Sequence, residues 1–237
     1  MGKRIIAQRR GSGSTAYRAP SFKFKGEAKH KSLSQEIGKG IVLDLITCRA
    51  HTAPLAVVEF EDGETILMIA PEGIAVGDEV ETNTHEAKGL NTLPLVDIPE
   101  GTAIFNIEGI PGDGGKFVRA SGTFAKILAQ QNGSVIVQLP SKKNKVFDGK
   151  CRATIGIVSG GGRPEKPMLK AGKAYHRAKQ RNHLYPTVAG SAMNAVDHPF
   201  GNKRTSRKSK NRPTPRNAPP GRKVGMVAAR RTGRKKK

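Results

Sequence analysis

The sequence has no tryptophan, two cysteines and few aromatic residues, and each shortage excludes a class of protein. Cys48 and Cys151 are too few and too far apart for a disulfide framework. No apolar run approaches the roughly 20 residues of a membrane span, and the basic start lacks the apolar stretch of a secretory signal. Eight phenylalanines and three tyrosines are too few for the stacking platforms of a single-strand binder. We therefore expect a cytosolic protein in a reducing compartment.

Acidic residues are scarce at both ends of the chain, which has a formal net charge of +23. Residues 150–237 contain 24 Lys and Arg against two acids, and residues 1–31 contain nine against one. Residues 32–149 carry a net charge of −7. Because the ends hold almost no carboxylates, they need an external polyanion that accepts many cations at once. Nucleic acid is the leading candidate.

A membrane surface is the alternative anionic partner, but it requires an amphipathic helix with an apolar face. Residues 201–223 contain nine Lys and Arg, four prolines and no Ile, Val, Leu, Met or Phe. Such a segment cannot bury enough apolar surface to offset the entropy of ordering it. We expect it to become ordered only on an anionic partner.

The apolar residues lie mainly between Ile37 and Val158, in short runs that predict β-strands. In the first half the expected strands are 41–46, 54–60, 65–70 and 74–80, and the last is interrupted by Gly77-Asp78, which suggests that it is entered through a tight bend. In the second half they are 124–130, 134–139, 145–147 and 152–158. Asp62-Gly63 and Asn132-Gly133 are expected to form tight hairpin turns. One helix is predicted, at 169–181.

This pattern predicts a mainly β fold, because four or five short strands at such spacing are typical of a small barrel or sandwich. We expect two small barrels in tandem between basic, extended ends. The predicted divisions are an amino-terminal tail 1–35, a first barrel 36–88, a second barrel 89–165 and a carboxy-terminal region 166–237.

Two glycine clusters place backbone without side chains next to a cation, at 111–116 and 160–163. Such backbone lets amide groups approach phosphate oxygens closely, although each cluster alone is also compatible with a plain turn. Neither cluster is a nucleotide site. The terminal Gly-Lys-Ser/Thr of a phosphate loop is absent, and no strand-turn-helix context surrounds either one.

Patterns for metal binding are poor. Cys48 and His51 have ligand-like spacing but no second pair, and His176 and His183 lie in a polycationic region that repels a metal dication. The sequence therefore predicts neither a metal site nor a cofactor.

Catalytic patterns are equally weak. Asp197 and His198 are an acid beside a base, but neighbours in sequence rarely orient one another as a catalytic pair. No Ser or Cys nucleophile is placed convincingly beside them. We expect no catalytic residue, and we interpret His198 as a packed or RNA-stacked imidazole.

Three long motifs occur in order along the chain and carry a family resemblance. They are GIPGDGGKFVRASG at 109–122, CRATIG at 151–156 and AMNAVDHPFG at 192–201. They closely resemble the universal large-subunit ribosomal proteins conventionally numbered two. Shorter motifs at 9–11, 22–23, 220–225 and 229–234 are similar to the archaeal and eukaryotic branch, and we favour an archaeal member. The chain departs from the family at Ala189, where Arg is usual, and at 200–203, where the family has a longer glycine run.

The resemblance implies an OB-fold-like barrel followed by a Src-homology-three-like barrel, with ends threaded into RNA. It implies a structural constituent of the large subunit that supports subunit association, tRNA binding and organisation of the peptidyl-transferase region. The expected partners are large-subunit rRNA, neighbouring ribosomal proteins and the small subunit, with no membrane and no small-molecule substrate.

Charge, glycine clusters and resemblance together give a set of expected RNA contacts. They are Arg9, Arg10, Lys23, Gly114, Gly115, Lys116, Arg119, Arg152, Arg163, Lys173, Arg177, Met193, Asn194, His198, Lys203, Arg204, Arg222, Lys223, Arg230 and Arg231. Two alternatives stay open: an RNA-modifying or peptidyl-transfer enzyme that uses His198, and a free RNA chaperone. Turnover by the purified chain would favour the first, and equal affinity for unrelated duplexes the second.

Overall fold

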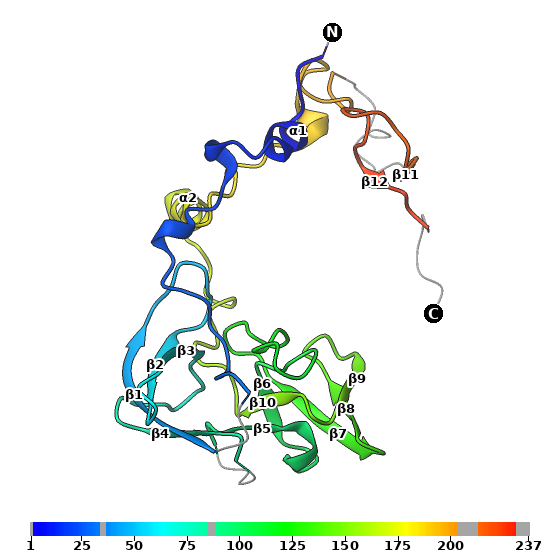
Figure 1. Cartoon of the computed structure of the whole chain (residues 1–237). Helices are drawn as coiled ribbons and strands as arrows, with labels where there is room; N and C mark the ends of the chain where they lie inside the picture. The colour runs from blue at the N-terminus through cyan, green and yellow to red at the C-terminus, as the bar shows by residue number, and fades with distance from the viewer. Residues whose placement is uncertain (1, 34–36, 85–88, 203–212, 231–237) are drawn as a thin grey trace. The chain divides into compact units, whose positions relative to one another are not determined.

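The structure is a computed structural model that describes residues 2–33, 37–84, 89–202 and 213–230 (Figure 1). It divides into two compact units. One is continuous, Ser21–Pro167, and the other combines Met1–Pro20 with Met168–Lys237. Across the described residues, no helix is long and apolar enough to cross a membrane.

The continuous unit contains a sheet of ten short strands, so the prediction of a mainly β fold is confirmed. The strands of the first half are β1 (Gly38–Ile46), β2 (Leu55–Phe60), β3 (Thr65–Ile69) and β4 (Glu79–Thr82). Those of the second half are β5 (Thr92–Pro94), β6 (Ala103–Phe105), β7 (Ala125–Gln131), β8 (Ser134–Gln138), β9 (Asn144–Asp148) and β10 (Arg152–Ile155). Their order in the sheet is β3-β2-β1-β4-β5-β10-β6-β7-β8-β9.

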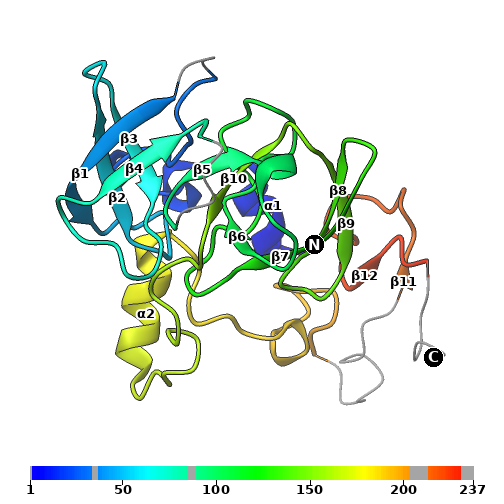
Figure 2. The ribbon, with the colours of Figure 1, turned by 90° about the horizontal axis from the view of Figure 1, so that it is seen from below.

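The two halves join where β4 pairs with β5 in parallel, at Thr82 and Thr92. Figure 2 shows β1 to β4 on one side of this junction and β7 to β9 on the other. Within the described ranges, no pairing connects β3 to β9. The ten strands therefore belong to one sheet, and no closed barrel is found among the described residues.

Both predicted hairpins are confirmed. β2 pairs with β3 antiparallel, and the turn between them contains Gly63 at φ +80°. β7 pairs with β8 antiparallel through Asn132 at φ +46° and Gly133 at φ +76°. Positive φ at both central residues is what a type I′ turn requires, and it matches the twist of the flanking strands.

The strand predicted at 74–80 is shorter than expected, because β4 begins only at Glu79, but the tight bend predicted at Gly77-Asp78 is confirmed by a turn at residues 76–77. The Asp78 carboxylate accepts a hydrogen bond of 2.7 Å from the Ala75 amide, and Gly77 has φ +94°. Both features bend the chain just before β4. Strands β5 and β6 were not predicted, since three residues are too short to show a periodic pattern.

Buried side chains form three clusters in this unit. One belongs to the first half and includes Val58 and Phe60, and one belongs to the second half and includes Leu93 and Ile127. The third combines residues of both halves, among them Leu55, Ile69, Phe105 and Val158. Because this shared cluster is apolar and buried, the halves pack as one body.

The second unit has few regular elements. They are α1 (Ile6–Gly11), η1 (Thr15–Tyr17), α2 (Ala171–Gln180), η4 (Gly190–Ala192) and the parallel pair β11 (Pro213–Thr214) and β12 (Met226–Val227). Helix α2 confirms the single helix that the sequence predicts. Helix α1 was not predicted, and its start is marked by a 3.1 Å hydrogen bond from the Ile5 amide to the Gln8 side chain.

Candidate nucleic-acid interface

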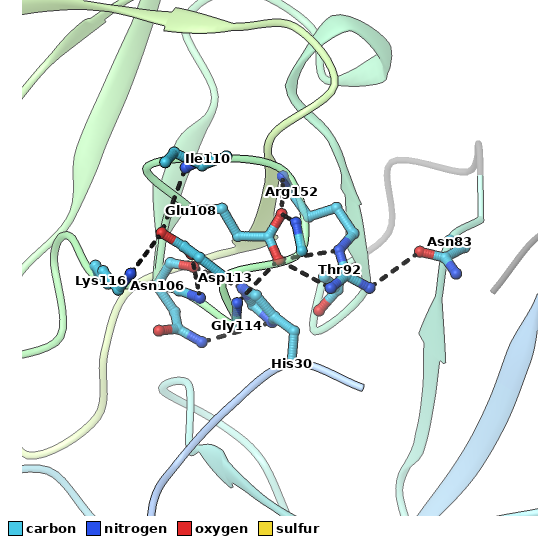
Figure 3. Close-up of polar contacts among 12 residues, drawn as sticks. His30, Asn83, Thr92, Asn106, Glu108, Ile110, Asp113, Gly114, Lys116 and Arg152 are labelled. Atoms are coloured by element: carbon cyan, nitrogen blue, oxygen red, sulfur yellow. Dashed lines mark hydrogen bonds and ion pairs between the residues drawn. The ribbon is translucent and has the colours of Figure 1, made fainter. Parts of the chain in front are cut away.

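A buried ion pair lies behind the glycine-rich loop of the first long motif. Glu108, which precedes the loop, is fully buried, and Arg152 on β10 is 1% exposed. The Arg152 guanidinium donates to one Glu108 carboxylate oxygen at 2.8 and 3.2 Å, and the Arg152 amide donates to the other at 2.9 Å (Figure 3). Arg152 also donates to Asn83, beyond the end of β4, at 3.3 Å. Its guanidinium therefore lies in the protein interior instead of at the surface where we expected an RNA contact.

The carboxylates of the loop hold its glycine amides. Glu108 accepts hydrogen bonds from the amides of Gly112 at 3.2 Å and Gly114 at 3.3 Å. Asp113 accepts from the amides of Gly109 and Gly115, both at 3.0 Å. Gly114 and Gly115 are buried. Their amides are already satisfied by carboxylates, so the structure gives no support to direct contacts between these glycines and phosphate.

Lys116 is the cation that the loop presents to solvent. Its ammonium lies 3.2 Å from the Asp113 carboxylate, and its side chain is 64% exposed. The Asp113 side chain is only 11% exposed and is held by the loop amides, but the Lys116 ammonium at its outer side is solvated, so Lys116 can exchange Asp113 for a phosphate oxygen. The two carboxylates thus shape the loop from inside, and a lysine faces outward.

Hydrogen bonds keep the buried Glu108 carboxyl ionised. Burial acts to raise its pKa, but hydrogen bonds from the Arg152 side chain and amide outweigh burial and hold the pKa below the usual value. The negative charge is therefore present at neutral pH, where it pairs with Arg152 and accepts from the loop amides.

His30 ties the amino-terminal segment of this unit to the same loop. The ring is 4% exposed, and its Nε2 lies 2.6 Å from the Asn106 carbonyl oxygen, so Nε2 donates (Figure 3). The His30 amide donates to the Gly114 carbonyl oxygen at 3.1 Å. Burial lowers the pKa of His30 to about 4, although the Asn106 carbonyl opposes the shift. The imidazole is therefore neutral under physiological conditions.

We predict that His30 makes folding stability depend on pH. Because its folded pKa of about 4 lies below the unfolded value near 6.5, the unfolded chain binds more protons in that interval. The contribution of His30 to the free energy of unfolding is fully present above about pH 6.5, and stability falls by roughly 3 kcal/mol as the pH decreases toward 4. Urea unfolding of His30→Gln between pH 4 and 7 is expected to lack this contribution. The exposed-site control His176→Gln is expected to keep it, and equal pH slopes in the two variants would contradict the assignment.

Arg119 also connects the loop to the amino-terminal segment. Its guanidinium donates to the carbonyl oxygens of Gly115 at 2.8 Å and Ala28 at 2.6 Å. The residue is half-buried. The guanidinium thus fixes two backbone segments, and only part of it is available to an RNA contact.

Most of the other expected contacts are exposed cations. They are Arg9, Arg10, Lys23, Lys116, Arg163, Lys173, Arg177, Arg222, Lys223 and Arg230. Lys173 and Arg177 are four residues apart on α2 and therefore lie on one face of the helix. Lys203, Arg204 and Arg231 lie outside the described residues. These exposed cations belong to different elements of both units.

The third long motif forms a compact loop around His198. The amide of His198 donates to the Asn194 carbonyl at 3.1 Å, and the amide of Asn202 donates to the Met193 carbonyl at 3.1 Å. Gly201 has no room for a side chain, since a Cβ there would lie 2.3 Å from the Asn194 carbonyl oxygen. Asn194 is exposed, whereas Met193 and His198 are half-buried. These three expected contact residues are therefore brought together.

Both the tautomer and the charge of His198 follow from its neighbours. Its Nδ1 accepts a 3.0 Å hydrogen bond from the Phe200 amide, so the neutral ring carries its proton on Nε2. Partial burial lowers its pKa. The ring contacts Phe200 edge to face, with centroids 5.0 Å apart. His198 thus offers a neutral hydrogen-bond donor at Nε2.

Metal ligands do not gather in the described part of the chain: no group of three or more His, Cys, Asp or Glu residues there could hold an ion. Cys48 and Cys151 are buried free thiols. Burial raises the pKa of Cys151 to about 11, which leaves it a thiol at neutral pH.

Comparison with known proteins identifies the family. The family described as "Ribosomal Proteins L2, C-terminal domain" matches residues 88–218. The "Large ribosomal subunit protein uL2" of Methanopyrus kandleri is 52% identical over 239 residues, covering 99% of this chain and 98% of that protein. The chain belongs to the L2 family. The protein of the same name from Haloarcula marismortui is 49% identical, covering 99% of this chain and 98% of its own length, and that from Methanococcoides burtonii is 51% identical, covering 99% and 100%.

The matched L2 region contains the glycine-rich loop, Arg152 and the His198 loop. These motifs are visible in the sequence, but the roles of Glu108, Asp113 and His30 are not. The signal available in the sequence was an acid within and beside a run of glycines. Such an acid organises the loop as an internal anion, which spacing alone does not reveal.

Proposed function

We propose that the chain is a structural constituent of the large ribosomal subunit and binds ribosomal RNA in the cytoplasmic ribosome. The observation that carries this function is sequence identity: about half of the aligned residues, over 99% of the chain, are identical to those of proteins named uL2. The charge distribution supports it. The unit formed by Met1–Pro20 and Met168–Lys237 contains 25 Lys and Arg against the single acid Asp197, and such a unit requires a polyanionic partner.

The proposed mechanism is neutralisation of phosphates. Exposed cations on α1, α2 and the carboxy-terminal region contact the RNA backbone and release its counterions. Lys116 adds a contact from the continuous unit. We also propose neighbouring ribosomal proteins and the small subunit as partners, with roles in subunit association, tRNA binding and organisation of the peptidyl-transferase region. The four divisions 1–35, 36–88, 89–165 and 166–237 belong to this proposal.

We further propose that the first half of the sheet is an OB-fold-like module and the second half a Src-homology-three-like module. Support comes from the apolar cluster that each half has of its own and from the pairing of β4 with β5, which joins the two sets of strands in the sheet order. In this arrangement the strands are a rigid base, and RNA contacts lie on loops and ends.

We propose that the protein acts as a scaffold and not as an enzyme. A general base needs a free lone pair within reach of the proton it removes. At His198 the Nδ1 lone pair is occupied by the Phe200 amide, and Nε2 is a donor. The ring is therefore suited to donate a hydrogen bond to RNA.

Sedimentation of cell extract tests the assignment to the large subunit. The protein is expected to travel with large subunits and to remain there when free proteins are washed away. A protein found only in the free fraction would contradict this assignment and favour a free RNA chaperone.

Substitution of His198 distinguishes a scaffold function from an enzymatic function. His198→Gln keeps a hydrogen-bond donor and approximate size, so assembled subunits are expected to form peptide bonds at a near-normal rate. The comparison uses equal amounts of assembled particles, with His198→Ala beside it, since alanine also loosens the loop. A loss of about a hundredfold in the chemical step for both variants, with intact assembly and tRNA binding, would indicate acid-base catalysis instead.

A further inference from the structure

All three tyrosines of the chain line one small pocket. Tyr17 comes from η1, Tyr175 from α2, and Tyr185 from the segment after the helix, and all belong to the same unit. The pocket has a volume of about 180 Å³ and is also lined by Lys179 and His183. Segments more than 150 residues apart in sequence thus contribute the only tyrosines to a single site.

Hydrogen bonds from one side chain build this pocket. The Asn182 amide group donates to the carbonyl oxygens of Ala16 at 2.7 Å and Arg18 at 2.8 Å, which holds η1 against the end of α2. Asn182 itself has φ +53°, and the next amide, of His183, donates to the Ala178 carbonyl at 2.9 Å. The chain therefore turns sharply after α2 and returns past η1 with Tyr185.

Two of the three tyrosines that line the pocket are partly exposed to solvent. Tyr175 is 42% exposed and Tyr185 is 37% exposed. Among the described residues no ring contact joins two of the tyrosines, and Tyr175 contacts His176 only edge to face. Aromatic faces left in water at a pocket wall gain free energy when another flat ring covers them.

The positive charge beside the tyrosine rings determines which kind of flat ligand the pocket favours. The Lys179 ammonium lies 5.6 Å from the centre of the Tyr175 ring and donates to the Tyr175 hydroxyl at 3.3 Å. Asp197 is the single acid of the unit, and it lies 3.8 Å from the Lys3 ammonium. A ligand that suits the pocket is therefore both flat and anionic, as a nucleotide is.

We propose that this pocket binds one unpaired base of an RNA strand, stacked on tyrosine, with the adjoining phosphate at Lys179. The proposal rests on the RNA-binding function proposed above and adds a base contact to its phosphate contacts. The volume is below the roughly 300 Å³ of pockets for drug-sized ligands, which fits one base. Cations outside the pocket hold the strand on either side of that base. The three tyrosines, too few for an extended stacking platform, suffice for one site.

Intrinsic fluorescence of the full-length protein tests this proposal. Because the chain has no tryptophan, its tyrosine emission originates entirely from this pocket. An eight-nucleotide oligoadenylate is expected to reduce the emission at least about twofold, since stacked bases quench tyrosine. Heparin, a polyanion without bases, is expected to bind the basic ends with little quenching. Equal quenching by heparin would overturn the proposal.

Variants assign the quenching to stacking. Tyr175→Leu is expected to weaken oligonucleotide binding about tenfold, and Tyr175→Phe, which keeps the ring, is expected to restore it. Lys179→Ala is expected to weaken binding more than Lys173→Ala, which removes the same charge from α2 outside the pocket. If Tyr175→Leu and Tyr175→Phe lose equal oligonucleotide affinity, or if the two lysine variants do, the pocket is not a site for a base.

Free adenosine monophosphate distinguishes a strand from a single nucleotide. We expect it to quench only at concentrations at least about a hundredfold higher than the oligonucleotide, because it lacks the flanking phosphates. Equal potency would overturn binding of an RNA strand. These measurements use the free chain, so they can fail while the protein still sediments with large subunits.

Discussion

Removal of residues 201–237 is expected to flatten the salt dependence of RNA binding: the slope of log K against the logarithm of the salt concentration becomes shallower by several units. The segment contains 15 Lys and Arg and no acid, and each phosphate contact contributes about 0.7 to 0.9 to the slope. The affinity at low salt falls by several orders of magnitude for the same reason. Filter binding or fluorescence anisotropy between about 50 and 200 mM salt measures both quantities.

Two replacement tails separate charge from sequence in this experiment. A Gly/Ser segment of equal length is expected to behave like the deletion, and a scrambled segment of the native composition is expected to recover most of the slope. An unchanged slope after deletion would mean that this part of the chain does not touch RNA.

Replacing Arg152 with methionine is expected to destabilise the folded protein by about 3–5 kcal/mol, because Glu108 would keep a buried charge without its partner. Urea unfolding at pH 7 measures the loss. Lys116→Met removes an exposed ammonium from the same loop and leaves Asp113 its hydrogen bonds from backbone amides, so it is expected to cost less than about 1 kcal/mol.

The double variant Glu108→Gln/Arg152→Met tests the cause of that loss. It removes both charges and leaves the Gln oxygen as an acceptor for the Gly112 or Gly114 amide, so it is expected to recover at least half of the stability. The double variant could instead unfold more easily than Arg152→Met, by as much as a separate destabilising substitution would cause. In that case the unpaired charge of Glu108 does not explain the stability lost in Arg152→Met.

The strands that could be predicted from sequence are those with a local signal. The hairpin at Asn132-Gly133 is specified by two adjacent residues whose backbone preference fixes the turn. Strands β5 and β6 have three residues each and exist because β10 lies between them as a pairing partner. No local pattern contains that information.

The candidate site shows the same limit. Exposed cations such as Lys173 and Arg177 could be predicted, because their number requires an external anion. Arg152 could not be distinguished from them, since its partner is 44 positions away. In the same way, the sequence shows three scattered tyrosines, and only the fold places them around one pocket.

The buried pair of Glu108 and Arg152 also has a consequence for how the protein changes over generations. A single substitution at either position leaves an unpaired charge in the interior, so lineages that carry one alone are expected to be lost. Viable descendants change both positions within a short interval or neither. We expect the two sites to vary jointly among related chains, whereas the exposed cations, each replaceable by another Lys or Arg nearby, drift independently.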